Sequence, residues 1–201
     1  MLAIEGLRSD LVGPVDLAVA PGECVTIEGP SGCGKTRFLR AIVDLDPNRG
    51  RVRLDDRRRE AMPAWRWRRL VGMVPAESGW WADRVGEHFE RPEALPPLLE
   101  ALGLPPDSPD WEVSRLSSGE RHRLAIARAL CLEPQALLLD EPTASLDAAA
   151  TARVEALLRR FQRSRRPLMI VTHDPEQARR LGARRLAMRE GRLSAMVEAP
   201  S

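Results

Sequence analysis

The chain has 201 residues, of which 43% are hydrophobic and 30% charged, and this balance excludes a wholly disordered protein. Basic and acidic residues number 31 and 29, so a net charge of +2 excludes a chain dominated by polyanion attraction. No apolar stretch is long enough to span a bilayer, and the start, MLAIEGLRSD, has acids where a signal peptide needs basic residues. We therefore expect a cytoplasmic protein of one compact domain, with free thiols at Cys24, Cys33 and Cys131.

The predicted elements alternate between strands and helices. Apolar runs over 11–28, around the turn Pro21-Gly22, predict a strand pair that ends at Gly29, and a helix follows from Lys35 until Pro47. The later expected elements are strands at 51–54 and 70–74, a proline-rich lobe over 75–115 with a short helix near 94–102, a helix at 119–132, a strand at 136–140, a helix at 148–163, a strand at 167–172, a helix at 175–182 and a hairpin around Glu190-Gly191. This order predicts an α/β fold with a mainly parallel sheet.

A glycine-rich loop carries the strongest chemical signal. The residues that match the P-loop pattern between a strand and a helix are Gly29, Pro30, Ser31, Gly32, Cys33, Gly34, Lys35 and Thr36, with Arg37 next to them in the expected ATP-binding stretch. Backbone N–H groups of such a loop hold phosphate oxygens at a helix N-terminus. Lys35 would reach the β- and γ-phosphates, and Thr36 would offer its hydroxyl to Mg²⁺. Lys35 is the single lysine among 31 basic residues, which indicates a position that cannot accept a guanidinium.

A second acidic site completes this chemistry. The apolar run ALLLD predicts a buried strand that ends at Asp140 and is followed by Glu141. Asp140 would hold Mg²⁺ through its water shell, and Glu141 would polarise the attacking water. Taken alone, two acids after a strand are equally consistent with a solvated strand end, and the P-loop decides between these interpretations.

Three further motifs narrow the class. Leu116-Ser117-Ser118-Gly119-Glu120, followed by RHRLAIARAL, closely resembles the LSGGQ signature of ATP-binding cassette (ABC) proteins. The run DEPTASLD at 140–147 resembles the stretch from the acidic strand into that family's D-loop, and Thr172-His173-Asp174 resembles its histidine switch. With the P-loop and the acidic strand these motifs stand in the family's order, so the chain is identified as a member of the ABC ATPase family.

The resemblance implies a P-loop NTPase (RecA-like) core with a mainly parallel sheet, N-terminal antiparallel strands and a small inserted helical lobe. It implies a single ABC nucleotide-binding domain over 1–201, with the core at 1–75 and 135–201 and the signature lobe at 76–134. It also implies that two ABC subunits, as a homodimer or heterodimer, enclose two ATP molecules between them. The signature residues Ser117, Ser118, Gly119 and Glu120 would then bind the nucleotide held by the other subunit.

Further roles follow from the same resemblance. Asp147 would lie at the subunit boundary, and His173 would hydrogen-bond the γ-phosphate, so the implied catalytic residues are Glu141, His173 and Lys35. The implied function is the ATP-binding and ATP-hydrolysing subunit of an ABC transporter, bound to separate integral membrane permease chains at the cytoplasmic face of the cell membrane, with ATP and Mg²⁺ as cofactors and no nucleic acid. A soluble ABC-type ATPase uncoupled from transport, or a weakly hydrolysing regulatory module, remains the alternative.

The sequence departs from the family at three positions. Ala76 stands where the glutamine of the Q-loop is expected, Ser118 replaces a signature glycine, and no aromatic residue precedes Phe38, although the family usually stacks one near residue 11 on adenine. Trp80 and Trp81 either dock the membrane partner or fill the lobe's core, and both interpretations stay open. The arginines from 57 to 69 are interpreted as a solvated face, because no aromatic platform accompanies them for nucleic acid.

Overall fold

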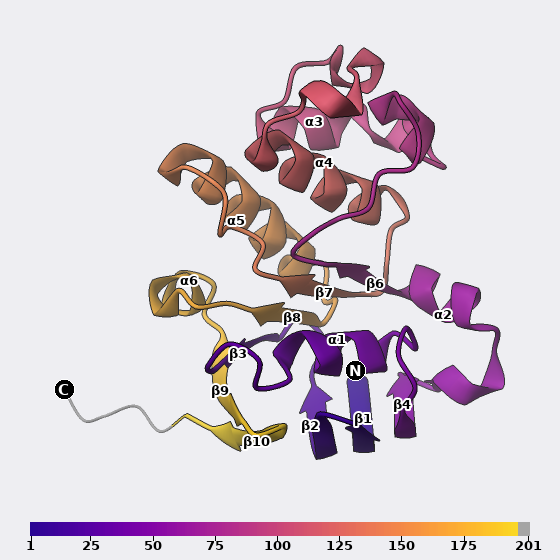
Figure 1. The fold of residues 1–201 in the computed structure, drawn as a ribbon, viewed down its shortest axis with the longest axis vertical. Coiled ribbons are helices and arrows are strands. Elements are labelled where there is room, and N and C mark those ends of the chain that lie inside the picture. The colour runs from indigo at the N-terminus through magenta and orange to yellow at the C-terminus, as the bar shows by residue number, and fades with distance from the viewer. Residues whose placement is uncertain (197–201) are drawn as a thin grey trace.

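A computed structural model describes residues 1–196, and a six-stranded sheet forms its centre (Figure 1). The strand order is β10-β9-β3-β8-β7-β6, and all neighbours are parallel except β10 and β9. The strands are β3 (Cys24–Glu28), β6 (Val71–Val74), β7 (Ala136–Asp140), β8 (Leu168–Val171), β9 (Arg184–Arg189) and β10 (Arg192–Ala195). The central strands β3, β7 and β8 are mostly apolar and almost fully buried, because helices or a second sheet cover both faces. The predicted α/β class and the final hairpin are therefore confirmed.

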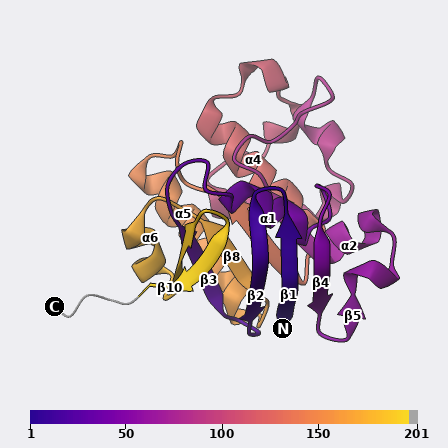
Figure 2. The same cartoon turned by 60° about the horizontal axis from the view of Figure 1, so that its bottom comes forward.

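An antiparallel sheet lies below the first in Figure 1 and comes to the front in Figure 2, with the strand order β2-β1-β4-β5. Its strands are β1 (Leu2–Ser9), β2 (Val12–Val19), β4 (Arg49–Leu54) and β5 (Arg57–Arg58). The expected pairing of the two strands within 11–28 is wrong, because β2 pairs with β1 whereas β3 pairs with β8 and β9. The reason lies in their burial: β2 alternates between buried and exposed residues, as in a sheet with one wet face, whereas β3 is buried almost throughout.

Helix α1 (Lys35–Ile42) lies between the two sheets and fills the first hydrophobic core (Figure 1). Its Phe38, Leu39 and Ile42 are fully buried. The helix ends earlier than predicted, and Asp44 already has a left-handed backbone with φ of 57°. Helix α1 begins directly after the glycine-rich loop, which follows the carboxyl end of β3.

The other face of the parallel sheet carries the second hydrophobic core. The helices on this side are α3 (Pro96–Leu102), α4 (Ser118–Cys131), α5 (Ala148–Arg163) and α6 (Pro175–Arg180), with the single-turn helices η2 (Val85–His88), η3 (Pro92–Ala94), η4 (Ser108–Asp110) and η5 (Val113–Arg115) around α3 and α4. Strand β7 serves both cores, because Ala136 and Leu138 belong to the first cluster and Leu137 and Leu139 to the second. Helices α1 and α4 therefore lie on opposite faces of one sheet (Figure 1).

The arginine-rich stretch contains a turn, η1 (Arg59–Ala61), and a helix, α2 (Ala64–Leu70), that the sequence did not indicate. Most of its arginines are exposed, as expected, but Arg59 is 6% exposed and donates to the carbonyl oxygen of Ala41 at 2.7 Å. Trp67 is fully buried and donates through Nε1 to the carbonyl oxygen of Ile42 at 2.9 Å. Both side chains thus donate to carbonyl groups in the last turn of α1, where the helix itself supplies few donors. Across the described residues, no helix has the length and apolarity needed to cross a membrane.

Candidate nucleotide-binding site

The glycine-rich loop is shaped by close contacts with the backbone. Gly29 has φ of 155° and Gly34 has φ of 108°. A Cβ atom on Gly29 would lie 2.2 Å from the carbonyl oxygen of Met188 in β9, and one on Gly34 would lie 2.7 Å from that of Leu11. Any larger residue at these two positions would displace the backbone, so the loop can approach β9 at Gly29 and Leu11 at Gly34 only with glycine.

Lys35 is the first residue of α1, and its side chain turns back into the loop. Its Nζ atom donates to the carbonyl oxygens of Gly29 at 2.7 Å and Pro30 at 2.9 Å, and the residue is 7% exposed. No carboxylate among the described residues forms an ion pair with it. The ammonium group is therefore held by neutral acceptors, which phosphate oxygens can replace without breaking a salt bridge.

Thr36 meets the acid that ends β7. Its hydroxyl donates to Oδ2 of Asp140 at 2.6 Å, and Asp140 is 2% exposed. The two residues are far apart in the sequence, and they meet because the carboxyl ends of parallel strands share one edge of the sheet. A hydroxyl and a carboxylate are oxygen ligands of the kind that Mg²⁺ prefers, so the pair fits the expected cation.

Glu141 and His173 follow β7 and β8 and lie together at the same edge. Nε2 of His173 is 3.1 Å from Oε1 of Glu141, although this oxygen is buried and accepts no well-aligned hydrogen bond. Burial raises the pKa of Glu141 and the charge of Asp140 adds to this effect, whereas His173 and Lys35 oppose it. A carboxylate with increased affinity for a proton is suited to draw a proton from water.

The signature residues begin α4. Ser117 caps this helix, because its Oγ accepts from the backbone N–H of Glu120 at 3.2 Å while Glu120 accepts from the N–H of Ser117 at 2.9 Å. The hydroxyl of Ser117 also donates to Glu120 and, with the backbone bond, lowers the pKa of that carboxyl. Among the described residues, no hydrogen bond or ion pair joins the stretch from Ser117 to Glu120 with the P-loop.

The remaining predicted site residues make their contacts away from the group formed by Lys35, Thr36, Asp140, Glu141 and His173. Ser31 and Gly32 are exposed, and Cys33 accepts from the N–H of Gly191 at 3.0 Å. Arg37 pairs with Asp46 at 2.9 Å, which turns its guanidinium toward the end of α1 rather than toward the loop. Asp147 is exposed and caps α5 by accepting from the N–H of Ala150 at 2.8 Å.

The segment after β6 contains the Q-loop position. Ala76 and Glu77 are exposed there and line a cavity of about 410 Å³ together with Ser118 and His122. His122 is a residue that the sequence analysis did not single out: it is 7% exposed, its Nε2 has no hydrogen-bond partner, and burial lowers its pKa. A buried, unpartnered polar atom beside a cavity cannot be recognised from sequence, because the helical spacing around it is ordinary.

A groove of about 280 Å³ runs between the end of α2, β6, η2 and α4. Trp81 lines it with 72% of its surface exposed, whereas Trp80 is half-buried against the second core. His88 fixes this turn, since its Nε2 accepts from the backbone N–H groups of Trp81 at 2.9 Å and Ala82 at 3.1 Å. The guanidinium of Arg128 lies 4.7 Å from one tryptophan ring and 5.0 Å from the other. One tryptophan thus belongs to the lobe's core and the other faces outward.

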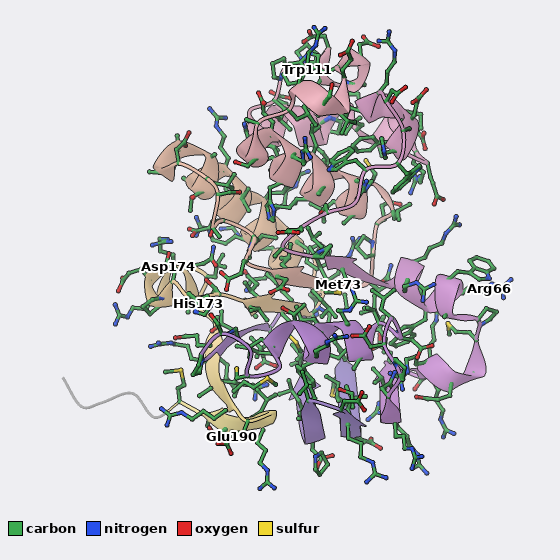
Figure 3. All side chains as sticks on the ribbon, in the orientation of Figure 1. Arg66, Met73, Trp111, His173, Asp174 and Glu190 are labelled. Carbon is green, nitrogen blue, oxygen red and sulfur yellow. The ribbon has the colours of Figure 1, made fainter. Side chains whose placement is uncertain are left out.

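The position where an aromatic residue is expected near the P-loop is occupied by leucine. Leu11 is 55% exposed and lines a hollow of about 320 Å³ with Gly32 and Cys33 of the loop and with Glu190 in the turn between β9 and β10 (Figure 3). The residues of this hollow are Ser9, Asp10, Leu11, Val12, Gly13, Gly32, Cys33, Glu190 and Gly191, and none is aromatic.

The sequence analysis also missed a charged cluster beside the switch histidine, formed by Glu155, Asp174 and Arg180. The available signal was weak. Glu155 interrupts an apolar run on α5 at a spacing where a buried residue is equally expected, and an acid in such a position is usually interpreted as the solvated edge of a helix.

The loop, Lys35, Thr36 and the two acids meet at the carboxyl edge of the parallel sheet, where open α/β sheets bind their ligands. This combination serves to bind a nucleoside triphosphate and to cleave its terminal phosphate. Fold and site therefore define a P-loop nucleoside triphosphatase.

Comparison with known proteins narrows that class. The family model described as ABC transporter matches residues 12–144, which is more than half of the chain. This chain belongs to the ABC transporter family, as an ATP-binding and ATP-hydrolysing subunit.

Two curated relatives are both named as import proteins. The aliphatic sulfonates import ATP-binding protein SsuB 2 of Paracoccus denitrificans is 40% identical, and the match covers 94% of this chain and 78% of that protein. The Fe(3+) ions import ATP-binding protein FbpC of Streptomyces coelicolor is 36% identical, with 96% of this chain and 61% of that protein covered.

Solved structures share the fold at lower identity. An ATP-binding subunit of an ABC transporter has a TM-score of 0.85 at 22% identity, covering 97% of this chain and 90% of that one. A dimeric ATP-binding cassette in a post-hydrolysis state with ADP and phosphate has a TM-score of 0.78 at 23% identity, covering 99% and 100%. These likenesses establish the arrangement of the elements.

Proposed function

We propose that this chain powers an ABC importer, as one half of an ATP-dependent dimer bound to separate permease chains at the cytoplasmic face of the membrane. The observation that carries the ATPase part is the meeting of Lys35, Thr36, Asp140, Glu141 and His173 at one sheet edge. The import direction is supported by the relatives of 35–40% identity that are named as import proteins. Residues 1–75 and 135–201 are its core, and residues 76–134 its helical lobe.

The site residues have separate roles in phosphate binding, Mg²⁺ binding and water activation. Backbone N–H groups of residues 29–36 and the Lys35 ammonium bind the phosphates, and Thr36 and Asp140 hold Mg²⁺. When bound, Mg²⁺ neutralises charge that develops on the phosphate oxygens. Glu141 takes the proton of the attacking water, and His173 donates a hydrogen bond to the γ-phosphate while limiting where Glu141 can lie.

The dimer follows from the position of the signature. Ser117, Ser118 and Gly119 offer a helix N-terminus for an anion, but α4 lies on the opposite sheet face from α1 and the P-loop of the same chain. A second copy, or a similar ABC subunit, brings its own nucleotide to this helix end. Asp147, exposed before α5, then lies at the boundary between the two subunits.

The permease binds at the groove beside Trp81. An exposed tryptophan next to a half-buried one, with an arginine over both rings, forms an anchor for an apolar partner segment. The backbone of this turn is fixed by His88, so binding needs little ordering of the loop.

Replacement of Trp81 by alanine is expected to weaken permease binding at least tenfold while leaving the thermal unfolding midpoint within a few degrees, because the ring is mostly exposed. The measurement is capture of a multi-spanning membrane protein from detergent-solubilised membranes of the source cell, identified by mass spectrometry. Trp65→Ala serves as the matched control, since Trp65 is also exposed but does not line the groove. Equal capture by the Trp81→Ala variant would remove the groove from the proposal, and capture of no membrane protein by the unaltered chain would remove coupling to transport.

Base recognition should be weak, because the hollow at Leu11 offers no ring for stacking. We expect ATP to be preferred over GTP by less than about tenfold, and Leu11→Tyr to raise the affinity for both by roughly tenfold, the effect of one stacked ring. Titration of each nucleotide with Mg²⁺ tests this, with Leu45→Tyr as the control at another exposed leucine. A hundredfold preference for ATP in the unaltered chain would reveal an adenine contact outside this hollow.

A further inference from the structure

We propose that Arg180 is a positioning residue for His173: it ties the loop that carries His173 to helix α5, which follows the D-loop. The inference rests on the proposed function, because it concerns the pair Glu141 and His173 as a hydrolytic site. It assigns a role to three charged residues, Glu155, Asp174 and Arg180. Asp174 lies within the histidine-switch motif, whereas Glu155 and Arg180 lie outside all five family motifs.

Arg180 joins two carboxylates from different elements. Its Nε lies 3.0 and 2.9 Å from the two carboxylate oxygens of Glu155 on α5, and its Nη2 lies 2.7 Å from the first of them. The same Nη2 donates to Oδ2 of Asp174 at 3.0 Å. A planar guanidinium that binds one carboxylate with two nitrogens fixes direction as well as distance, which a flexible ammonium does not.

Glu155 is a costly choice if its only task is to fill space. The residue is 2% exposed, and the other buried residues of α5 are apolar: Ala150, Val154, Leu157, Leu158 and Phe161. Burial of a carboxylate carries a desolvation penalty that a leucine of similar size avoids, and a buried ion pair often adds no net stability over apolar side chains. The pair therefore calls for a role other than stability, and fixing the geometry of its neighbours is the role its contacts support.

Asp174 transmits this anchor to the histidine. It directly follows His173, and the two side chains lie together at the start of α6 (Figure 3). One carboxylate oxygen of Asp174 caps α6 by accepting from the N–H of Glu176 at 2.9 Å, while the other accepts from Arg180. Its own N–H donates to Oγ1 of Thr172 at 3.0 Å. The residues on both sides of His173 are thus held, and the ring is left to face Glu141.

A second link joins α6 to the segment that leads into the D-loop. Gln177 is fully buried and donates through Nε2 to Oγ1 of Thr143 at 2.8 Å. Thr143 follows Glu141 by two residues. A cavity of about 730 Å³ is bordered by Glu141, Thr143, Glu155, His173, Asp174 and Arg180. Because the links run around an open space, the separation of His173 from Glu141 depends on them rather than on dense packing.

The test removes both members of the ion pair at once, the buried Glu155 and the exposed Arg180. The variant Glu155→Leu with Arg180→Met leaves no fully buried charge without a partner, because Asp174 and Arg159, which each lose one ion pair, are both partly exposed. We therefore expect the thermal midpoint to stay within a few degrees of the unaltered chain. We expect the ATP dissociation constant and KM to change less than about twofold and kcat to fall roughly tenfold, as for loss of an interaction needed only in the transition state. Arg179→Met is the matched control, because the neighbouring Arg179 is also an exposed arginine of α6 but pairs with Glu176 on its own helix and not with α5.

A double-mutant cycle decides whether Arg180 acts through His173. In a His173→Ala background, the paired substitution should lower kcat no further, since the residue to be positioned is gone. A second tenfold loss in that background would show an independent effect and would overturn the proposal.

Amide hydrogen exchange gives a readout that does not depend on turnover. The backbone amides of Thr172, His173, Asp174 and Glu176 should exchange at least tenfold faster in the paired variant, and at an unchanged rate in Arg179→Met. Unchanged exchange in the paired variant would overturn the positioning role, whatever the ATPase rate. Conversely, if the unaltered chain hydrolyses no ATP while the exchange rates rise as expected, the proposed function fails and the structural link stands.

Discussion

Glu141→Gln is expected to bind MgATP with unchanged affinity and to lose at least about 100-fold in turnover, because the amide cannot take a proton from water. The substitution keeps the shape of the side chain, and the P-loop contacts of Lys35 do not involve it. With hydrolysis blocked, the ATP-bound dimer should persist and elute from a sizing column ahead of the monomer.

The matched control is Glu100→Gln on α3, which removes an exposed carboxylate of the same kind. It should hydrolyse ATP at the rate of the unaltered chain and show no trapped dimer. Turnover at the normal rate by the Glu141→Gln variant would mean that another group activates the water, and the assigned role of Glu141 would be wrong.

Lys35→Arg is the second substitution with a large expected effect. We expect nucleotide affinity to fall at least tenfold and turnover at least about 100-fold, because the compact ammonium fits between two carbonyl oxygens and a broad planar guanidinium does not. The residue is 7% exposed, so the larger group has no free space beside it. Fluorescent-nucleotide titration and phosphate release measure the two effects.

Arg66→Lys provides the control in the opposite direction. Arg66 is exposed on α2, where the exchange of one cation for the other should change neither binding nor turnover. If Lys35→Arg also behaved like the unaltered chain, positive charge alone would suffice in the loop, and the absence of other lysines would carry no information about this position.

The P-loop half of the site could be predicted because its geometry is encoded locally. Glycines in left-handed conformations, a strand before them and a helix after them are all adjacent in the sequence, so Gly29, Gly34 and Lys35 could be assigned without tertiary information. The sequence analysis assigns Thr36 and Asp140 to one Mg²⁺ ion, and their contact agrees with the general rule that parallel strands present their carboxyl ends at one edge.

Other features depend on contacts that no local pattern encodes. Strand β1 contains Gly6 at φ of 58° and shifts its register with both neighbours, so its apolar residues do not alternate regularly. Helix α2 has one fully buried residue, Trp67, in a run of arginines, and the carbonyl group that this side chain satisfies belongs to a distant helix. Arg59 is buried for the same reason. Such partners become visible only when the whole chain is folded.

Strand β7 contributes side chains to both hydrophobic cores, and this arrangement allows the helical lobe to move separately from the sheet. Leu137 and Leu139 contact the second core through side chains alone, whereas the backbone of β7 is hydrogen-bonded to β6 on one edge and β8 on the other. Shear of α3 and α4 across this apolar face would therefore break no hydrogen bond of the sheet, and it would leave the contact of Thr36 with Asp140 in place. Asp140, which we propose holds Mg²⁺, belongs to the sheet and not to these helices, so movement of the lobe with a partner would not displace it.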